Sequence, residues 1–336
     1  MRAVQDATAP LLRCPRCRTD GRLLATATER DAAEIRTGTV VCGACGWTGA
    51  VAGGIVDLLH APPAFVVREA AGLARFAEEM RNAGWDRERV LRLPDEPSAF
   101  WHGQRASFDA LRAAVDFRPG ERLLDIGANT CWASAAFARD GLDVVALDIS
   151  RHELQGLETA DWWMAHDGTR FERALGVMFD LPFAPGTFDH VFCCEVLHHN
   201  SPRTLLRTMR EAHRVLKPGG RLSVIRETLR APGNLQLRPG HEVAQYDGNE
   251  HAFTAASYLA AARLAGFRVE VLDPARHWVL SGDPFPPATR LRGRIRLAAL
   301  ERVRRGPRSR RAYRAWLHHV AGGVPLSFVA SRGSSA

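Results

Sequence analysis

Apolar positions along the chain follow two different spacings, and each spacing predicts a different kind of element. Residues 64–80 and 100–115 carry apolar side chains at helical spacing, so we expect two helices there. Farther along, the short apolar runs Arg122–Ile126 and Asp143–Asp148 flank a helical stretch at Ala133–Arg139. This strand–helix–strand order predicts a parallel sheet with right-handed crossovers.

Further elements of the same α/β type follow. We expect strands at residues 176–179, 190–194, 221–226, 267–272 and 323–331, and helices at residues 203–216, 289–305 and 310–320. Pro307 separates the last two helices.

The composition is that of a globular protein with more than one domain. Its 336 residues are 46% hydrophobic and 24% charged, which excludes wholesale disorder. No apolar run approaches the roughly 18 residues of a membrane helix, and residues 1–10 lack the apolar core of a signal peptide. We therefore expect a cytoplasmic protein without a transmembrane segment. The sequence leaves its oligomeric state open.

The net charge of +8 comes from one segment. Lys217 is the only lysine, and eleven arginines against Glu301 alone give residues 290–314 a local charge of +10. The remaining chain is close to neutral, so the charge by itself does not indicate a nucleic-acid-binding protein. The arginines predict either a solvated helix face or a surface for an anionic partner such as a phosphorylated substrate, RNA or an acidic membrane.

Four of the seven cysteines form two C-x-x-C pairs. Cys14 and Cys17 make the first pair, Cys42 and Cys45 make the second, and 24 residues separate the pairs. A C-x-x-C knuckle turns both sulfurs into one space, so two knuckles can complete a tetrahedral four-thiolate zinc site. No ligand position is left open, which predicts a structural zinc that residues 1–60 need in order to fold. The alternative interpretations are a pair of redox dithiols or a chance occurrence of the spacing.

The N-terminal segment also resembles a known module. Leu11–Pro15, Cys42–Gly46 and Gly53–Leu59 match the "LL-x-CP-x-C" opening and "GI-x-x-LL" ending of small zinc-ribbon proteins that bind and activate methyltransferases. The resemblance covers about residues 9–60, and it implies that the rest of the chain is a methyltransferase.

A second motif, Leu124–Cys131, closes a strand and opens a helix, which is where ligands bind in doubly wound sheets. Gly127 allows close backbone approach, and Asp148 ends the next strand, where a carboxylate can accept both ribose hydroxyls of a nucleoside. A dinucleotide site needs glycines as G-x-G-x-x-G, but Asn129 and Trp132 stand at the second and third positions. The pattern therefore favours S-adenosylmethionine, which has a ribose, an adenine, an amino acid end and a sulfonium but no phosphate.

At this point the chain resembles the class I S-adenosylmethionine-dependent methyltransferases, and within them the broad group that includes the ubiquinone-biosynthesis type. The family pattern D-x-G-x-G-x-G has two of its glycines replaced, because it reads here Asp125, Gly127, Asn129 and Cys131. The family implies a Rossmann-like, seven-stranded, doubly wound α/β sheet whose last strand is antiparallel.

Three further stretches carry the same resemblance. Residues 181–189, 190–199 and 211–220 resemble the family's "LPF-x-x-G-x-FD", "V-x-x-x-x-V-LHH" and "E-x-x-RVLKPGG". Together the motifs cover about residues 119–273, and they imply S-adenosylmethionine as the cofactor.

The resemblance also implies which residues bind the cofactor. The expected set is Asp125, Gly127, Asn129, Asp148, Ile149, Met178, Phe179, Asp180 and Cys194. The family often has an acidic residue about four positions before "LPF", which binds the adenine amino group. Here that region is apolar, so the adenine contact falls to the backbone near Met178 and Phe179, with Asp180 as the nearest acidic residue.

Methyl transfer from a sulfonium is an in-line displacement that mainly needs alignment, and an oxygen or nitrogen acceptor can need a base as well. The candidate bases follow the strand at residues 190–194 and are Glu195, His198 and His199. The alternative interpretation is that both histidines cap a helix or line the cofactor pocket.

A long loop punctuated by glycine and proline follows at residues 228–254. Loops at the carboxyl end of such a sheet carry substrate-binding groups. A second metal site from His241, Glu242, Glu250 and His251 is conceivable, but their spacing matches no standard metal-binding pattern.

These patterns divide the chain into a zinc ribbon at residues 1–60, a helical linker or lid at 61–118 and a methyltransferase domain at 119–336, with a basic two-helix insertion at about 276–322. The main functional hypothesis is methyl transfer from S-adenosylmethionine to a small molecule such as a natural product, a sugar or a lipid precursor. One alternative is an RNA methyltransferase that uses the zinc ribbon and the arginine-rich segment. The other is a non-catalytic cofactor-binding scaffold.

Overall fold

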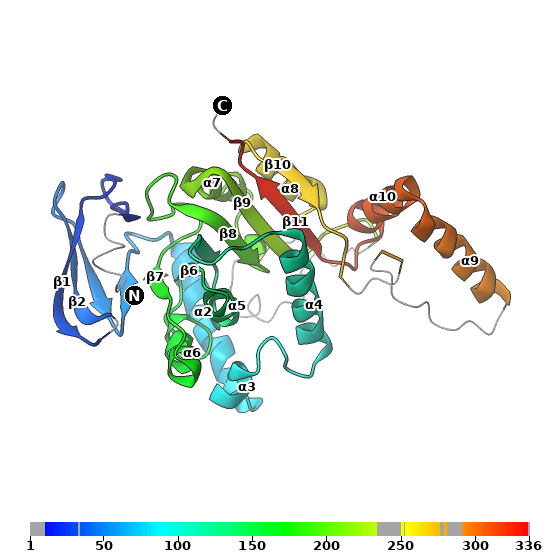
Figure 1. The fold of residues 1–336 in the computed structure, drawn as a ribbon. Coiled ribbons are helices and arrows are strands. Elements are labelled where there is room, and N and C mark those ends of the chain that lie inside the picture. The colour runs from blue at the N-terminus through cyan, green and yellow to red at the C-terminus, as the bar shows by residue number, and fades with distance from the viewer. Residues whose placement is uncertain are drawn as a thin grey trace.

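The computed structural model describes residues 11–32, 34–233, 250–251, 253–275, 279–280 and 291–334. Within these residues one sheet of eleven strands runs through the molecule in the order β1-β2-β3-β4-β7-β6-β5-β8-β9-β11-β10 (Figure 1). The strands are β1 (Leu23–Arg30), β2 (Ile35–Cys42), β3 (Thr48–Ala52), β4 (Ile55–Asp57), β5 (Arg122–Ile126), β6 (Asp143–Asp148), β7 (Glu172–Leu175), β8 (Phe188–Cys194), β9 (Leu216–Glu227), β10 (Arg268–Val271) and β11 (Leu326–Ser331).

Most of the helices lie on the two faces of this sheet, whereas the last two extend away from it (Figure 1). They are α2 (Ala64–Asn82), α3 (Arg87–Leu91), α4 (Ala99–Ala114), α5 (Trp132–Arg139), α6 (Ala160–Asp167), α7 (Leu205–Val215), α8 (Ala255–Leu264), α9 (Leu291–Arg305) and α10 (Pro307–Trp316). Three short helical turns are η2 (Leu157–Thr159), η3 (Leu197–His199) and the π-helical η5 (Leu317–Ala321).

The N-terminal strands extend the sheet and do not form a separate one. Strands β1 to β4 pair antiparallel in chain order, and β4 then pairs parallel with β7 through Val56 with Ala174 and Asp57 with Leu175. The sheet therefore has eleven strands where seven were predicted, because the cysteine-containing segment adds four strands at the β7 edge (Figure 1).

The centre of the sheet is parallel. Strands β7, β6, β5, β8 and β9 run in one direction, and most of their side chains are buried, as is usual for a sheet covered on both faces. Strand β11 lies between β9 and β10 and is antiparallel to both, as the family resemblance implied. The carboxyl ends of the parallel strands consequently lie at the same end of the sheet. This is the end at which α/β sheets bind ligands.

Helices bury apolar side chains against each face of the sheet. Phe108 of α4 and Phe137 of α5 belong to one buried cluster, whereas Met209 of α7 and Tyr258 of α8 belong to a second. The start of α4 is fixed by Ser98, whose hydroxyl accepts a hydrogen bond from the backbone N–H of Trp101 at 3.3 Å. The two helices predicted from the first apolar spacing are therefore present, as α2 and α4.

One predicted strand was misplaced. The apolar run at residues 176–179 was expected to be a strand, but β7 ends before it, at Leu175. The actual strand contains Arg173, which is fully buried and forms ion pairs with Glu34 and Asp161. Arginine is rarely buried, and it is buried here because both ion pairs compensate its charge. The charged side chain interrupts the run of apolar residues that would otherwise mark a buried strand, so the sequence pattern did not locate β7.

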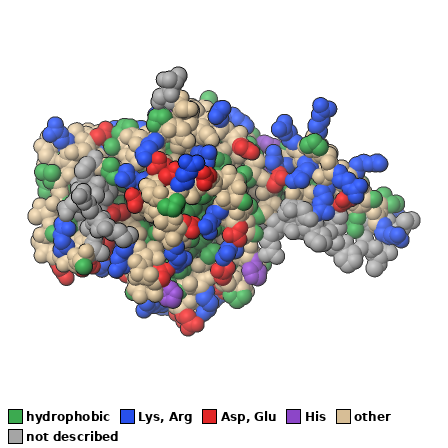
Figure 2. Space-filling view, viewed as in Figure 1, with side chains coloured by type: hydrophobic (Ala, Val, Ile, Leu, Met, Phe, Trp, Pro, Cys, Tyr) green, Lys and Arg blue, Asp and Glu red, His purple; other side chains and the backbone are tan. Residues whose placement is uncertain are grey.

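The arginine-rich segment forms α9 and α10, and Figure 2 shows basic side chains gathered over this part of the surface. Two of its arginines are structural, since Arg310 and Arg314 bind Asp273 at 2.8 and 2.7 Å. Others such as Arg292 and Arg294 are exposed to solvent. In the described part of the chain, no helix combines the length and apolar character needed to cross a bilayer.

The central position of β11 can be tested at Phe328. This side chain is fully buried, and its residue pairs with Val224 of β9 and Val271 of β10. Phe328→Ala should lower the free energy of unfolding by about 3–5 kcal/mol, because truncation leaves a cavity in the core. Urea denaturation measures the change. Ser331→Ala, at the half-buried end of the same strand, should change it by less than about 0.5 kcal/mol, and equal effects of the two substitutions would contradict this placement.

Candidate functional site

A cavity of about 770 Å³ opens at the carboxyl ends of β5, β6 and β8. The loops after these strands line one side, and α2, α3, α4 and the segments between them line the other. Polar side chains of the lining include Glu69, Arg89, Glu96, Gln104, Asp125, Asn129, Thr130, Asp148, Gln155, Glu195 and His199. Large apolar side chains include Leu73, Phe76, Trp85, Phe100, Trp101 and Trp132.

The loop after β5 has a left-handed backbone at three positions, Gly127 (φ 71°), Asn129 (φ 45°) and Cys131 (φ 55°). The two residues that replace glycine in the family pattern therefore keep a glycine-like conformation, which costs roughly 1–2 kcal/mol at each. At Gly127 a Cβ atom would lie 2.2 Å from Cγ2 of Val196, so only glycine fits there. The loop thus has the shape that lets backbone approach a ligand closely.

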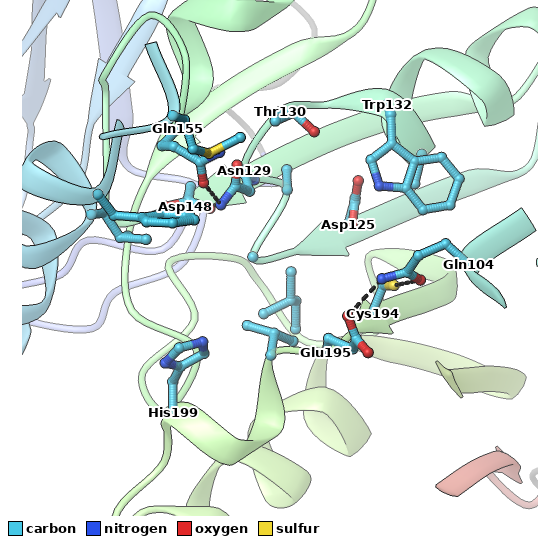
Figure 3. Close-up of a pocket in the computed structure, with 18 of the residues that line it drawn as sticks. Gln104, Asp125, Asn129, Thr130, Trp132, Asp148, Gln155, Cys194, Glu195 and His199 are labelled. Carbon is cyan, nitrogen blue, oxygen red and sulfur yellow. Dashed lines mark hydrogen bonds between the residues drawn. The ribbon is translucent and has the colours of Figure 1, made fainter. Parts of the chain in front are cut away.

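Asp148 is a firmly held carboxylate in the cavity wall. It ends β6 and is 7% exposed, and its two oxygens accept hydrogen bonds from the backbone N–H groups of Asn129 (2.9 Å) and Ser150 (2.8 Å). The side chain of Asn129 donates to Gln155 at 2.8 Å, beside Asp148 (Figure 3). Burial raises the pKa of Asp148, and the backbone donors act against this shift.

Asp125 of β5 is the second buried carboxylate of the cavity. Its Oδ2 accepts a hydrogen bond from the hydroxyl of Ser134 at 2.6 Å. Burial raises the pKa of Asp125 to about 7, and the nearby charge of Asp148 acts in the same direction. A cationic group beside Asp125 would oppose both effects, so this end of the cavity suits an ammonium.

The other predicted cofactor residues divide into two groups. Ile149, Met178 and Cys194 line the cavity. Phe179 and Asp180 lie outside its lining, because Phe179 packs against Phe65 with ring centroids 5.7 Å apart and Asp180 forms ion pairs with arginines. Those arginines are Arg18 at 2.9 Å and Arg207 at 3.2 Å. The side chains of both residues thus have their partners outside the lining of the cavity.

Glu195 follows β8 directly and is held from two sides. Its backbone is left-handed, with φ 49°. Its carboxylate accepts hydrogen bonds from Nε2 of Gln104 at 2.6 Å and from Nε of Arg226 at 3.2 Å. Cys194 donates to Oε1 of Gln104 at 3.1 Å, which completes a polar row along this wall (Figure 3). The position of the Glu195 carboxylate is thereby fixed.

The two histidines predicted as candidate bases have different surroundings. His198 is fully buried and does not line the cavity, and its Nδ1 lies 3.2 Å from Oε2 of Glu227. His199 does line the cavity, and its Nδ1 lies 2.8 Å from Oε1 of Glu69. His198 is thus not placed to act as a base on a molecule in the cavity.

Glu227 holds the turn that carries these histidines. It ends β9 and is fully buried, and its carboxylate accepts hydrogen bonds from the backbone N–H groups of Val196 (3.0 Å), Leu197 (2.9 Å) and His198 (3.2 Å). Burial raises the pKa of Glu227 to about 7. This single carboxylate binds most of the turn after β8.

Two polar residues that α2 and α4 contribute to the walls, Glu69 and Gln104, were not predicted from the sequence. Both lie on the buried faces of their helices. The helical spacing could have indicated both residues. Glu69 follows Val66 by three positions and Gln104 precedes Phe108 by four, so each polar residue lies on the apolar face of its helix. A polar residue within an apolar helical stripe usually has a specific partner.

The four cysteines of the N-terminal segment come together. Cys14 and Cys45 have their sulfurs 3.7 Å apart, as do Cys17 and Cys42, and all four lie within 4.8 Å of one another. A tetrahedral zinc with Zn–S bonds of about 2.3 Å separates its sulfurs by about 3.8 Å, so the cluster fits such a site. Hydrogen bonding with Thr19 lowers the pKa of Cys17 to about 6, whereas burial raises the pKa of Cys14 to about 12.

The first cysteine knuckle also contacts the segment that follows the cavity residue Met178. Leu12 forms a β-bridge with Phe183, and the backbone N–H of Arg13 donates to the carbonyl of Pro182 at 3.0 Å. Together with the ion pair between Arg18 and Asp180, these contacts join the cysteine cluster to the central part of the sheet.

Comparison with known proteins identifies part of the chain. Residues 124–224 match the family model described as a methyltransferase domain. A demethylmenaquinone methyltransferase from Beutenbergia cavernae is 40% identical over 124 residues, which are 36% of this chain and 45% of that protein. A 27-O-demethylrifamycin SV methyltransferase from Amycolatopsis mediterranei is 30% identical over 150 residues, which are 44% of this chain and 51% of that protein. The chain spans about half the length of these curated relatives.

A solved structure shows a weaker likeness. An S-adenosylmethionine-dependent methyltransferase from Mesorhizobium loti is 20% identical, and the alignment covers 68% of this chain and 98% of that chain with a TM-score of 0.43. The matches in sequence support the presence of a methyltransferase domain, and that domain contains Asp125, Gly127, Asp148 and Glu195.

Proposed function

We propose that this chain is an S-adenosylmethionine-dependent methyltransferase that acts on a small molecule. The observation that carries the proposal is the fixed carboxylate of Asp148 in the cavity wall. Both of its oxygens are held by backbone N–H groups, so the remaining lone pairs are oriented to accept the two hydroxyls of a ribose. The matches to methyltransferases give this geometry its chemical context.

The remaining cofactor contacts follow from the same cavity. Asp125 attracts the ammonium of the amino acid end, and Gly127 and Asn129 bring backbone close to it. Ile149 and Met178 lie against the adenosine, next to the loop that follows β7. S-adenosylmethionine supplies an activated methyl group on a sulfonium. The protein then needs to align the acceptor with that methyl group.

The proton of a hydroxyl or amine acceptor can be taken by Glu195 or His199. Both line the cavity, and each is held in place by a lid residue, Gln104 for Glu195 and Glu69 for His199. A base fixed in this way does not have to change its side-chain position when the acceptor loses its proton.

We assign the side of the cavity that is lined by aromatic residues to the acceptor. This side favours a molecule with an apolar ring system. Trp101 packs against three other aromatic rings, with centroids 5.4 to 6.3 Å apart, and these rings belong to Trp85, Phe100 and Trp132. Flat apolar molecules bind well against such walls. The cited relatives are named for demethylmenaquinone and 27-O-demethylrifamycin SV, which supports a quinone-like or natural-product acceptor here.

The four-cysteine cluster has a structural role in this proposal. Zinc bound by Cys14, Cys17, Cys42 and Cys45 leaves no ligand position open, so it takes no part in the reaction. It instead fixes the knuckles that pack beside residues 180–183.

Transfer of a tritiated methyl group tests the activity and the acceptor class. The protein, labelled S-adenosylmethionine and a cell extract should yield label in the small-molecule fraction, and Asp148→Ala should remove most of it. Label confined to the RNA fraction would contradict the small-molecule acceptor. If the protein binds the cofactor but no fraction becomes labelled, the result would favour the alternative of a non-catalytic cofactor-binding scaffold.

Cofactor affinity tests Asp148 separately. Asp148→Ala should weaken binding of S-adenosylmethionine about tenfold or more, roughly 1.5–3 kcal/mol, because the ribose hydroxyls lose a charged acceptor. Calorimetry measures the dissociation constant. Asp143→Ala, at the exposed start of the same strand, is the matched control and should bind like the wild type. An unchanged affinity in Asp148→Ala would contradict the assignment.

Cofactor binding should weaken as the pH falls from about 8 to 6. Asp125 has a pKa of about 7 in the protein, and only its ionised form attracts an ammonium. Below that pH the carboxyl must lose a proton on binding, so the dissociation constant should rise by up to about tenfold per pH unit. Asp125→Asn should bind more weakly at pH 8 and show a shallower dependence on pH. The same pH dependence in both proteins would count against this role of Asp125.

Metal analysis tests the cysteine cluster. Cys14→Ser and Cys45→Ser should each lose the thiolate-bound zinc and lower the melting temperature, because the N-terminal strands depend on it. Cys193→Ala, which removes a thiol from the sheet core, should retain the zinc. Freshly purified wild type with less than about half an equivalent of zinc would rule out a tight structural site.

A further inference from the structure

We propose that His198, His199 and Glu250 form a second metal site, for a divalent transition-metal ion, at the edge of the cavity. One ligand atom from each residue lies within 4.8 Å of the other two. Two imidazole nitrogens and one carboxylate oxygen are the protein ligands of His₂Glu zinc sites and of two-histidine, one-carboxylate iron sites. The donor set differs in kind from the four thiolates of the N-terminal cluster.

The local backbone explains why two adjacent histidines converge. Neighbouring residues of a strand point to opposite faces, but β8 has already ended and His198 and His199 lie in the 3₁₀ turn η3. Their ring centroids are only 4.3 Å apart, with an angle of 38° between the planes. The turn therefore presents both imidazoles to one small volume.

Each imidazole also has the partner that a metal-binding histidine usually has. Nδ1 of His198 lies 3.2 Å from the carboxylate of Glu227, and Nδ1 of His199 lies 2.8 Å from that of Glu69. In metal sites such carboxylates fix the tautomer and the orientation of the ring, and the metal then binds at the other nitrogen, here Nε2. These contacts suit a role for Glu69 and Glu227 as positioning residues for the two ligands.

Glu250 reaches the histidines because the following residue is tied to them. The backbone N–H of His251 donates to the carbonyl of His198 at 2.7 Å. The ring of His251 also stacks on Phe253, with centroids 6.1 Å apart. Of the four loop residues considered from the sequence, His241 and Glu242 lie outside the described residues.

The charge of the cluster favours a cation. Glu69, Glu227 and Glu250 place three carboxyl groups around two imidazoles, and Glu227 and Glu69 are 0% and 4% exposed. Negative charge in such a low-dielectric region is stabilised by a metal ion bound among the ligands.

The position of His199 suggests what the metal would do. With the metal on Nε2 and Glu69 at Nδ1, His199 has no nitrogen left to accept a proton, so Glu195 is the base in the metal-bound protein. His199 both belongs to the cluster and lines the cavity. An ion held by three protein ligands keeps a coordination position open, and that position would take an oxygen atom of the acceptor. This assignment of a hydroxyl-bearing acceptor rests on the proposed function, whereas the metal site itself does not.

Cobalt(II) is a suitable probe. Purified full-length protein is dialysed against a mild chelator, and metal analysis confirms that the thiolate-bound zinc remains. Calorimetric titration with Co²⁺, without S-adenosylmethionine, should then show about one further equivalent. Its visible spectrum should have d–d bands but lack thiolate-to-cobalt charge transfer, because no cysteine is a ligand.

Variants assign the ligands. Glu250→Gln and His199→Gln should each weaken Co²⁺ binding at least tenfold, and Glu69→Gln should weaken it about 10–100-fold through His199. Glu270→Gln, an exposed glutamate of β10, is the matched control and should bind like the wild type. Melting temperatures close to that of the wild type show that the variants are folded.

No further equivalent of Co²⁺, a thiolate charge-transfer band, or wild-type affinity in both Glu250→Gln and His199→Gln would overturn the site. Calorimetry with S-adenosylmethionine on the same samples separates the two proposals. Cobalt binding without cofactor binding would refute the methyltransferase assignment and leave the metal site intact. Cofactor binding without cobalt binding would refute the metal site and leave the methyltransferase assignment intact.

Discussion

The buried carboxylate of Glu227 fixes the part of the molecule on which the cavity depends. It lies at the end of β9, and it accepts three consecutive backbone N–H groups from the turn after β8. Two neighbouring strands thereby stay coupled beyond the point where their backbone pairing ends. This turn places Val196 against Gly127 and His199 in the cavity wall. Each buried N–H left without an acceptor would cost roughly 1–3 kcal/mol.

The cavity is assembled from segments far apart in the sequence. The strand ends supply Asp125, Asp148 and Glu195, and the helices over residues 64–114 supply the opposite wall. Polar contacts join the two sides, from Gln104 to Glu195 and from Glu69 to His199. The helical cover therefore takes its position partly from the same groups that are proposed to act on the acceptor.

Residues at strand ends could be predicted from the sequence, whereas contacts between distant segments could not. Asp125 and Asp148 each follow an apolar run, so local periodicity was enough to locate them. Strand β7 was misplaced because its Arg173 is buried through ion pairs, one of them with Glu34, which lies 139 residues away in the chain. The pairing of β4 with β7, and the approach of Glu250 to the histidines, involve separations that no local pattern encodes.

Strand β7 would be the edge of the sheet if β4 did not pair with it. It is a four-residue strand with buried Ala174 and Leu175, and an open edge of this kind is a template for pairing with other chains. The N-terminal strands move the edge outward to β1, which ends in the charged, exposed residues Glu29 and Arg30. If those strands need zinc to fold, metal supply also governs aggregation. Protein made in a zinc-poor cell would then expose β7 as the edge of the sheet and self-associate there, even if its cavity were correctly formed.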